Sequence, residues 1–202
     1  MEVHEKIAPT FWILARSGGV TAYLLVTAAI VLGLCVKTRL LSRVRPVVVV
    51  DLHRLVSLLA LGALGIHVGG LVLDANKPAS IPSYIVPGLM EYRPVWTGVG
   101  VVVAELMIVI HLSFRYRTRI GPRAWRRLHW ATYLVFAGAT LHGLASGSDS
   151  ALPWARAMYL GALSAVVGLT AWRALSPRPA PRARPPSPVT PTVPLPNDQG
   201  AS

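Results

Sequence analysis

The sequence is poor in cysteine, in acidic residues and in charge as a whole. A single cysteine, Cys35, among 202 residues excludes an internal disulfide framework and a zinc or iron–sulfur site built on cysteine. Charged residues make up 14% of the chain, whereas a soluble domain carries about a quarter. The sequence has no glycine-rich phosphate loop, no dinucleotide-binding fingerprint and no HExxH motif. These absences exclude the soluble enzyme classes that depend on such sites.

Long apolar runs dominate the sequence instead. Hydrophobic residues make up 53% of it, and five runs reach the roughly 20 residues that cross a bilayer. The runs cover about 10–36, 47–73, 95–114, 125–145 and 153–175. We therefore predict an all-α integral membrane protein with a five-span helical bundle over 10–175. The rest is expected to be a short outer stub, 1–9, and a disordered proline-rich cytoplasmic tail, 176–202, which has too few large apolar residues to fold.

The distribution of positive charge predicts how the bundle is oriented. The net charge is +12, from 20 basic and 8 acidic residues. The basic residues stand in short blocks after the first, third and last runs, which is the pattern of a membrane protein and argues against a nucleic-acid partner. The positive-inside rule makes these segments cytoplasmic, so the N-terminus is expected outside and the C-terminus in the cytoplasm.

Two of the predicted spans carry two histidines each. His53 and His67 are 14 residues apart in the second span, and His129 and His142 are 13 apart in the fourth. Because these spans run in the same direction, we expect His53 to meet His129 near the cytoplasmic side and His67 to meet His142 near the outer side. Ionisable side chains inside a span are costly, so two matched pairs favour a functional site over hydrogen bonds between helices. Two facing imidazoles suit the axial positions of a haem iron.

One of the two spacings does not fit an ideal helix. Residues 14 apart return to within about 40° of the same face, whereas residues 13 apart lie about 140° out of phase. The sequence therefore predicts a non-ideal first turn at His129 or a local distortion of the fourth span, with Gly138 as a candidate position. A single four-ligand zinc site is disfavoured because the two levels lie too far apart in depth.

At these residues the chain resembles the ferric-reductase-like transmembrane domain, which NADPH oxidases, ferric-chelate reductases and bacterial haem-b membrane subunits share. The similar segments are 14–18, 51–54 with His67, 92–96, and 127–130 with His142. The resemblance covers about residues 10–175. It implies two b-type haems with His53, His67, His129 and His142 as ligands of the iron.

The resemblance also implies a function and a location. Electrons would cross the membrane from a cytoplasmic flavoprotein reductase or membrane quinol to an extracytoplasmic redox protein or small acceptor. Because 202 residues leave no room for an FAD/NADPH domain, the chain is more similar to the stand-alone bacterial members. These include the haem-binding subunit that supplies a periplasmic methionine-sulfoxide reductase. We therefore expect an oxidoreductase subunit in a bacterial inner or plasma membrane, in contact with lipid.

Other polar residues of the spans have expected roles beside the histidines. Arg16 is expected to have an electrostatic role at the outer haem or between the two haems, and Arg54 either serves the propionates of the inner haem or extends to the headgroups. Glu105 is expected to pair with Arg16 or to accept protons from quinol. His111 is expected to face the cytoplasmic interface, with a reserve ligand or a quinone contact as the alternatives.

Two alternatives to this function stay open. One is a subunit that holds a single haem on the outer pair. The other is a non-redox scaffold or transporter whose histidines only form hydrogen bonds.

Overall fold

The computed structural model describes residues 2–38, 40–74 and 79–176, with side chains from residue 10. Its elements are α1 (Glu2–Thr38), α2 (Pro46–Leu73), the short 3-10 helix η1 (Ile81–Tyr84), α3 (Pro94–Arg115), α4 (Arg117–Ile120), α5 (Pro122–Trp130), α6 (Thr132–Ser146) and α7 (Pro153–Leu175). No strand occurs in these ranges, which confirms the all-α prediction. The predicted tail at 176–202 lies outside the described residues except for Ser176.

Four helices in the described ranges are long and apolar enough to cross a membrane. They are α2, α3, α7 and the Thr10–Thr38 part of α1. α2, α3 and α7 each begin with a proline. Proline has no backbone N–H, and this costs nothing at that position because N–H groups of the first turn have no acceptor within the helix. These helices match four of the five predicted spans, although α1 begins earlier, at Glu2.

The fourth predicted span is two helices rather than one. α5 ends at Trp130 and α6 begins at Thr132, with Ala131 between them. The N–H of Ala131 donates to the carbonyl of Leu128 at 2.9 Å, a bond over three residues that tightens the chain before α6 starts. The distortion therefore lies at Ala131 and not at Gly138. Gly138 is inside α6, where a methyl group would overlap Val103 of α3, so it allows close packing instead.

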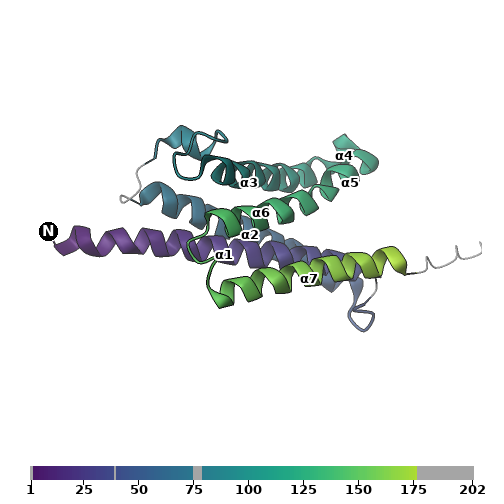
Figure 1. Cartoon of the computed structure of the whole chain (residues 1–202). Helices are drawn as coiled ribbons and strands as arrows, with labels where there is room; N and C mark the ends of the chain where they lie inside the picture. Colours follow the sequence, from purple (N-terminus) through teal and green to yellow (C-terminus); the bar gives the residue numbers. More distant parts are fainter. Residues whose placement is uncertain (1, 39, 75–78, 177–202) are drawn as a thin grey trace, which may run out of the picture.

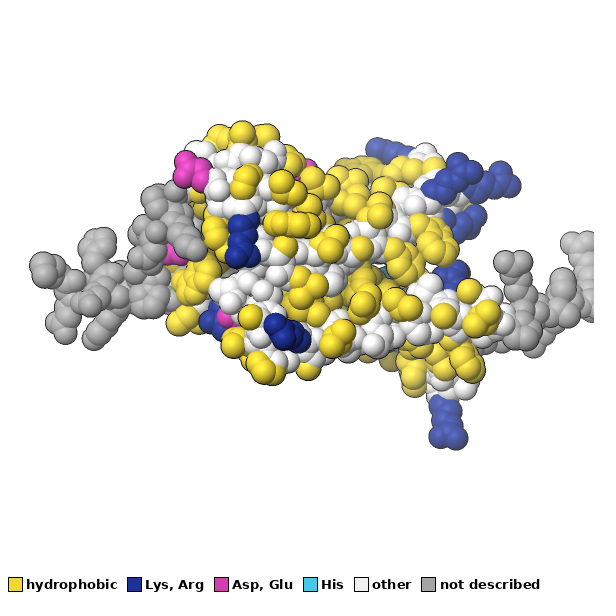
Figure 2. Space-filling view, in the orientation of Figure 1, with side chains coloured by type: hydrophobic (Ala, Val, Ile, Leu, Met, Phe, Trp, Pro, Cys, Tyr) yellow, Lys and Arg dark blue, Asp and Glu magenta, His cyan; other side chains and the backbone are white. Residues whose placement is uncertain are grey.

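The long helices lie side by side in an elongated bundle (Figure 1). α2 and the α5–α6 segment run in one direction, whereas α1, α3 and α7 run in the other. The α1–α2 connection, α4 and α5 lie at one end, and η1 and the α6–α7 connection lie at the opposite end. Lys and Arg side chains gather at the first of these ends, while the middle of the visible surface is mostly hydrophobic (Figure 2).

Small residues let α1 and α2 pack against each other more extensively than any other pair of described helices. A methyl group at Gly70 would lie 2.6 Å from the backbone nitrogen of Ala15 and 2.9 Å from the carbonyl oxygen of Phe11. Close backbone approach of this kind is typical of helix pairs in membranes. On its other side α1 contributes Tyr23 and Ile30 to a core shared with α6 and α7.

The close contact at Gly70 leads to a stability prediction. Gly70→Ala is expected to lower the stability of the detergent-solubilised protein by about 1–3 kcal/mol, because backbone atoms of α1 cannot yield cheaply to the new methyl group. Gly62→Ala is the matched control on α2, since a methyl group at Gly62 would have nothing within 4 Å of it. Thermal unfolding monitored by circular dichroism measures both. Equal melting temperatures for the two variants would contradict the expected tight contact.

Candidate functional site

The structure brings the four span histidines together in two pairs. The ring centroids of His53 and His129 are 6.2 Å apart, with an angle of 76° between the ring planes. Those of His67 and His142 are 6.3 Å apart, with an angle of 78°. The side chains meet in a space between α2 and α5–α6, helices that make little direct contact with each other. The pairing expected from the sequence is therefore present.

These distances distinguish between two explanations of the pairs. A direct hydrogen bond between two imidazoles would bring their centroids to about 5 Å. Two imidazoles on opposite sides of one metal ion have centroids about 6.2 Å apart, because each metal–nitrogen bond is about 2.0 Å and the nitrogen lies about 1.1 Å from its ring centroid. Both observed separations match the second arrangement, and no hydrogen bond joins the rings of either pair.

Three of the histidines are held by the same arrangement of a hydrogen bond and a glycine. The Nδ1 atom donates to a backbone carbonyl: His53 to Ala29 at 2.8 Å, His67 to Ala15 at 2.6 Å and His142 to Trp96 at 2.9 Å. In each case a glycine stands four residues after the acceptor and faces the ring: Gly33, Gly19 and Gly100. We call the carbonyl and its glycine a carbonyl–glycine clamp. It fixes the ring and leaves Nε2 for a ligand, as second-shell acceptors do for metal-bound histidines.

The clamps on α1 repeat with the spacing of the histidines on α2. Ala15 and Ala29 are 14 residues apart, Gly19 and Gly33 are 14 apart, and His53 and His67 are 14 apart. Because α1 and α2 are antiparallel, the repeat brings each clamp to its own histidine. Sequence reasoning missed these backbone acceptors, although the repeated Ala-x-x-x-Gly pattern of α1 was a visible signal.

His129 is placed differently from the other three. It forms no hydrogen bond with the described part of the chain, and its ring stacks on Trp125, with centroids 5.1 Å apart and planes 20° apart. The indole nitrogen Nε1 of Trp125 is buried and has no partner among the described residues. Sequence reasoning missed this contact.

The interruption at Ala131 explains how the 13-residue spacing works. On one continuous helix, His129 and His142 would face in different directions. His129 belongs to α5 and His142 to α6, and the turn between these helices changes the phase. Both rings therefore reach α2, one at each level.

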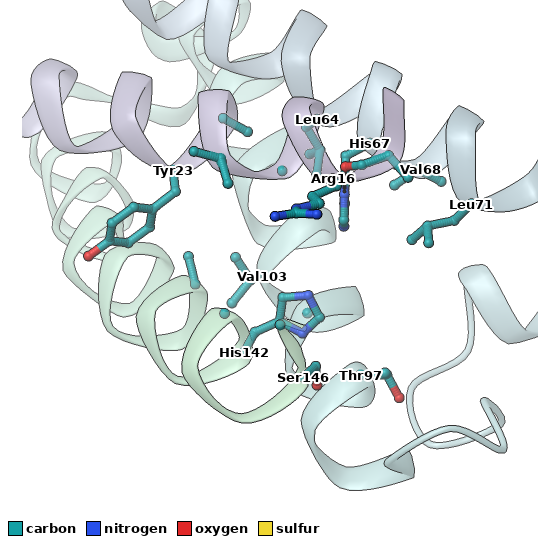
Figure 3. A pocket seen from close by; sticks show the side chains of 18 of the residues that line it. Arg16, Tyr23, Leu64, His67, Val68, Leu71, Thr97, Val103, His142 and Ser146 are labelled. Carbon is teal, nitrogen blue, oxygen red and sulfur yellow. Dashed lines mark hydrogen bonds between the residues drawn. The ribbon is translucent and has the colours of Figure 1, made fainter. Parts of the chain in front are cut away.

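A cavity of about 310 Å³ lies at the level of His67 and His142. Figure 3 shows His67 from α2 and His142 from α6 extending into it, with Arg16 beside His67. Arg16 forms an ion pair with Asp149, on the α6–α7 connection. The hydroxyl of Ser146, which also lines the cavity, is buried without a partner among the described residues. The cavity thus combines two imidazoles, a cation and an orphaned polar atom with largely apolar walls.

The segment before α3 closes one end of this cavity. Tyr84 lines it and donates its hydroxyl to the carbonyl of Leu71 at 3.0 Å. Burial and the neighbouring Asp74 raise the pKa of the Tyr84 hydroxyl above its ordinary value. Arg93, with φ of 45°, donates to the carbonyl of Ala145 at the end of α6. This contact satisfies a terminal carbonyl of the helix that carries His142.

A model of one known protein family matches this chain. The family model described as "Ferric reductase like transmembrane component" matches residues 18–140, which is more than half of the chain. The chain belongs to this family. The match spans His53, His67 and His129 and ends two residues before His142. No curated protein and no solved structure matches.

In this member of the family, three other polar residues of the spans do not line the cavity. Arg54 is exposed, pairs with Asp51 at 3.1 Å and lies over the ring of Phe114. Glu105 is exposed on α3. The expected pairing of Glu105 with Arg16 is wrong, because Arg16 is turned toward the α6–α7 connection and pairs with Asp149. His111 lies on α3 and belongs to neither pair.

The described residues contain no group of three or more His, Cys, Asp and Glu side chains able to hold a metal ion. The candidate ligands therefore come in twos. Each pair offers two imidazole nitrogens, so a metal held there would need its remaining ligands from a bound group such as a haem.

Proposed function

We propose that this protein transfers electrons across a membrane through two b-type haems, one held by each histidine pair. The observation that carries the proposal is the separation of the paired rings, 6.2 and 6.3 Å, with no hydrogen bond between them. Membership of the ferric-reductase-like transmembrane family supports the same chemistry. A b-type haem supplies a one-electron carrier, because its iron alternates between the ferric and ferrous states.

In this proposal His53 and His129 ligate the inner haem and His67 and His142 the outer one. The clamps orient three of the rings and strengthen them as ligands, because Nδ1–H donation to a carbonyl makes the opposite nitrogen more basic. Each level also has one buried polar atom without a described partner, Trp125 Nε1 at the inner level and the Ser146 hydroxyl at the outer level. These donors suit the propionate groups of the porphyrin.

The two arginines named from the sequence take supporting roles. Arg16 lines the outer cavity and supplies positive charge beside His67, with Asp149 limiting its movement. Arg54 follows His53 in sequence and is held by Asp51 and Phe114 at the inner level. Positive charge close to a haem stabilises the ferrous state and the propionates together.

We further propose that α5 and α6 together make a fifth crossing. α6 has 15 residues, or about 22 Å of helix, and the nine residues of α5 extend it toward the basic end of the bundle. With five crossings the two ends of the chain lie on opposite sides of the membrane. The basic end belongs in the cytoplasm by the positive-inside rule, which puts the N-terminus outside.

This topology assigns the partners to the two ends of the bundle. The donor, a cytoplasmic flavoprotein or membrane quinol, delivers electrons to the level of His53 and His129. The acceptor, an extracytoplasmic redox protein or a small molecule, takes them at the level of His67 and His142. The segment 79–93 beside the outer cavity exposes Ile81, Ile85, Val86 and Leu89, which suits contact with lipid or an acceptor protein.

The deciding experiment is a spectrum of the full-length protein purified in detergent from haem-replete cells. We expect a dithionite-reduced minus oxidised spectrum of low-spin b haem and two haems per chain in a pyridine haemochrome assay. One haem per chain would favour the alternative that uses only the outer pair, where the cavity lies. A folded protein without haem would overturn the electron-transfer proposal.

A further inference from the structure

The two histidine pairs differ in how firmly the chain holds them. Both rings of the outer pair sit in carbonyl–glycine clamps, on Ala15 and Gly19 and on Trp96 and Gly100. Only one ring of the inner pair, His53, has a clamp. The other ring of the inner pair, His129, has no clamp and stacks on Trp125 instead.

The register of α3 shows why the fourth clamp is missing. The two clamps of α1 are 14 residues apart. With the same repeat on α3, a second clamp would have the carbonyl of Ile110 as its acceptor and a glycine at position 114. The carbonyl of Ile110 already accepts from the Ser113 hydroxyl at 2.6 Å. Residue 114 is phenylalanine, and its ring contacts Trp125 edge-on with centroids 6.0 Å apart. The position that corresponds to the glycine of a clamp therefore carries a large side chain, which packs on Trp125.

The helix that carries His129 is also weakly anchored. α5 has nine residues and none of them is buried. Gly121, with φ of 87°, precedes it, and the break at Ala131 follows it. α2 and α6, which carry the other three histidines, are longer and each contributes buried residues to the bundle. Short elements with few buried contacts open locally at low free energy, so His129 can withdraw without disturbing its partner helices.

We propose that His129 is an exchangeable ligand, and that a small neutral molecule of the carbon monoxide class takes its place at the inner site. The inference rests on the proposed function. The exchange breaks the bond from Nε2 of His129 to ferrous iron and forms a bond from the carbon of carbon monoxide to the same iron. Each ligand gives one electron pair, so the iron stays ferrous and nothing is oxidised. Histidines that lose a second-shell acceptor bind metal about 10–100-fold more weakly, and the inner site should favour carbon monoxide over the outer site by about that factor.

Two double variants locate the exchange. His67→Ala with His142→Ala retains only the inner pair, and His53→Ala with His129→Ala retains only the outer pair. Each purified protein is reduced with dithionite and titrated with carbon monoxide, and the Soret shift is recorded beside a haemochrome haem count. We expect the inner-only protein and the unchanged chain to bind carbon monoxide at one haem. The outer-only protein is expected to bind it about 10–100-fold more weakly.

A second comparison uses the intact set of histidines. Trp125→Ala removes the stack on His129, and Trp130→Ala is the matched control, since the Trp130 ring stacks on Tyr133 instead. Trp125→Ala is expected to increase carbon monoxide affinity at the inner haem by about 10-fold, because it removes the aromatic ring that stacks on His129, while Trp130→Ala leaves the affinity unchanged.

The outcomes separate the two proposals. A protein with two ferrous low-spin haems that binds no carbon monoxide, or binds it first at the outer haem, overturns the exchangeable ligand and leaves electron transfer intact. Equal effects of Trp125→Ala and Trp130→Ala also count against it. A protein without haem removes both proposals together.

Discussion

His67→Ala is expected to reduce the haem content from two per chain to one and to leave the inner haem spectrum in place. His67 is half of one pair only, and the other pair is about 21 Å away along α2, given a rise of about 1.5 Å for each of 14 residues. His53→Ala is expected to give the reciprocal result, with the outer haem retained. Haem per protein from the haemochrome assay, together with the reduced-minus-oxidised spectrum, measures both.

His111→Ala is the matched control for these variants. His111 lies on α3, a candidate membrane span, and belongs to neither histidine pair, so both haems should remain when it is removed. Retention of two haems in His67→Ala, or loss of one in His111→Ala, would contradict the assignment of the ligands.

Gly19→Ala is expected to destroy the outer site, whereas Gly33→Ala, 14 residues further along α1, is expected to be tolerated. A methyl group at Gly19 would lie 2.8 Å from Nδ1 of His67, so the ring must leave the Ala15 carbonyl. At Gly33 the nearest ring atom of His53 is 3.6 Å away, an ordinary van der Waals distance. Displacement of a well-packed group costs about 1–3 kcal/mol and here also misaligns the ligand.

Haem content and the redox potential of each haem distinguish the two glycine variants. In Gly19→Ala we expect loss of the outer haem, or a raised potential where it remains, because a ring without its carbonyl acceptor is a weaker donor to ferric iron. Gly100→Ala should have the same effect through His142, since its methyl group would lie 2.6 Å from that ring. If Gly33→Ala lowered the haem content as much as Gly19→Ala, the distance between the added methyl group and the histidine ring would not explain the effect.

Much of the architecture could be predicted from the sequence because membranes impose simple rules. Apolar runs longer than about 20 residues have few alternatives to a spanning helix, and four of the five predicted spans are long apolar helices in the structure. The pairing of His53 with His129 and of His67 with His142 followed from the depth of each histidine and the direction of the two spans, although the 13-residue spacing required a distortion of the fourth span. The break at Ala131 could be inferred as a distortion but not located, since alanine carries no local signal for a helix end.

The contacts that distinguish the two pairs were beyond the sequence reasoning. Backbone carbonyls have no identity in a sequence, so the acceptors at Ala15, Ala29 and Trp96 appear only once the helices are placed. The partner of Arg16 was wrongly expected to be Glu105, because spacing along two helices does not show which way each side chain turns. The rotation of α1 and the path of the α6–α7 connection bring Arg16 to Asp149 instead.

The break at Ala131 bears on which changes of length the fold tolerates. On the α1–α2 side, the clamps and the histidines repeat every 14 residues, so deleting one residue between Ala15 and Ala29 would turn one acceptor away by about 100°. On the α5–α6 side, the turn already absorbs a spacing that is one residue shorter than 14. Insertions and deletions among relatives should therefore be confined to the surroundings of Ala131, while α1 and α2 keep the same count. The α1–α2 half of the bundle therefore fixes the distance between the two levels, and the α5–α6 half adjusts to that distance.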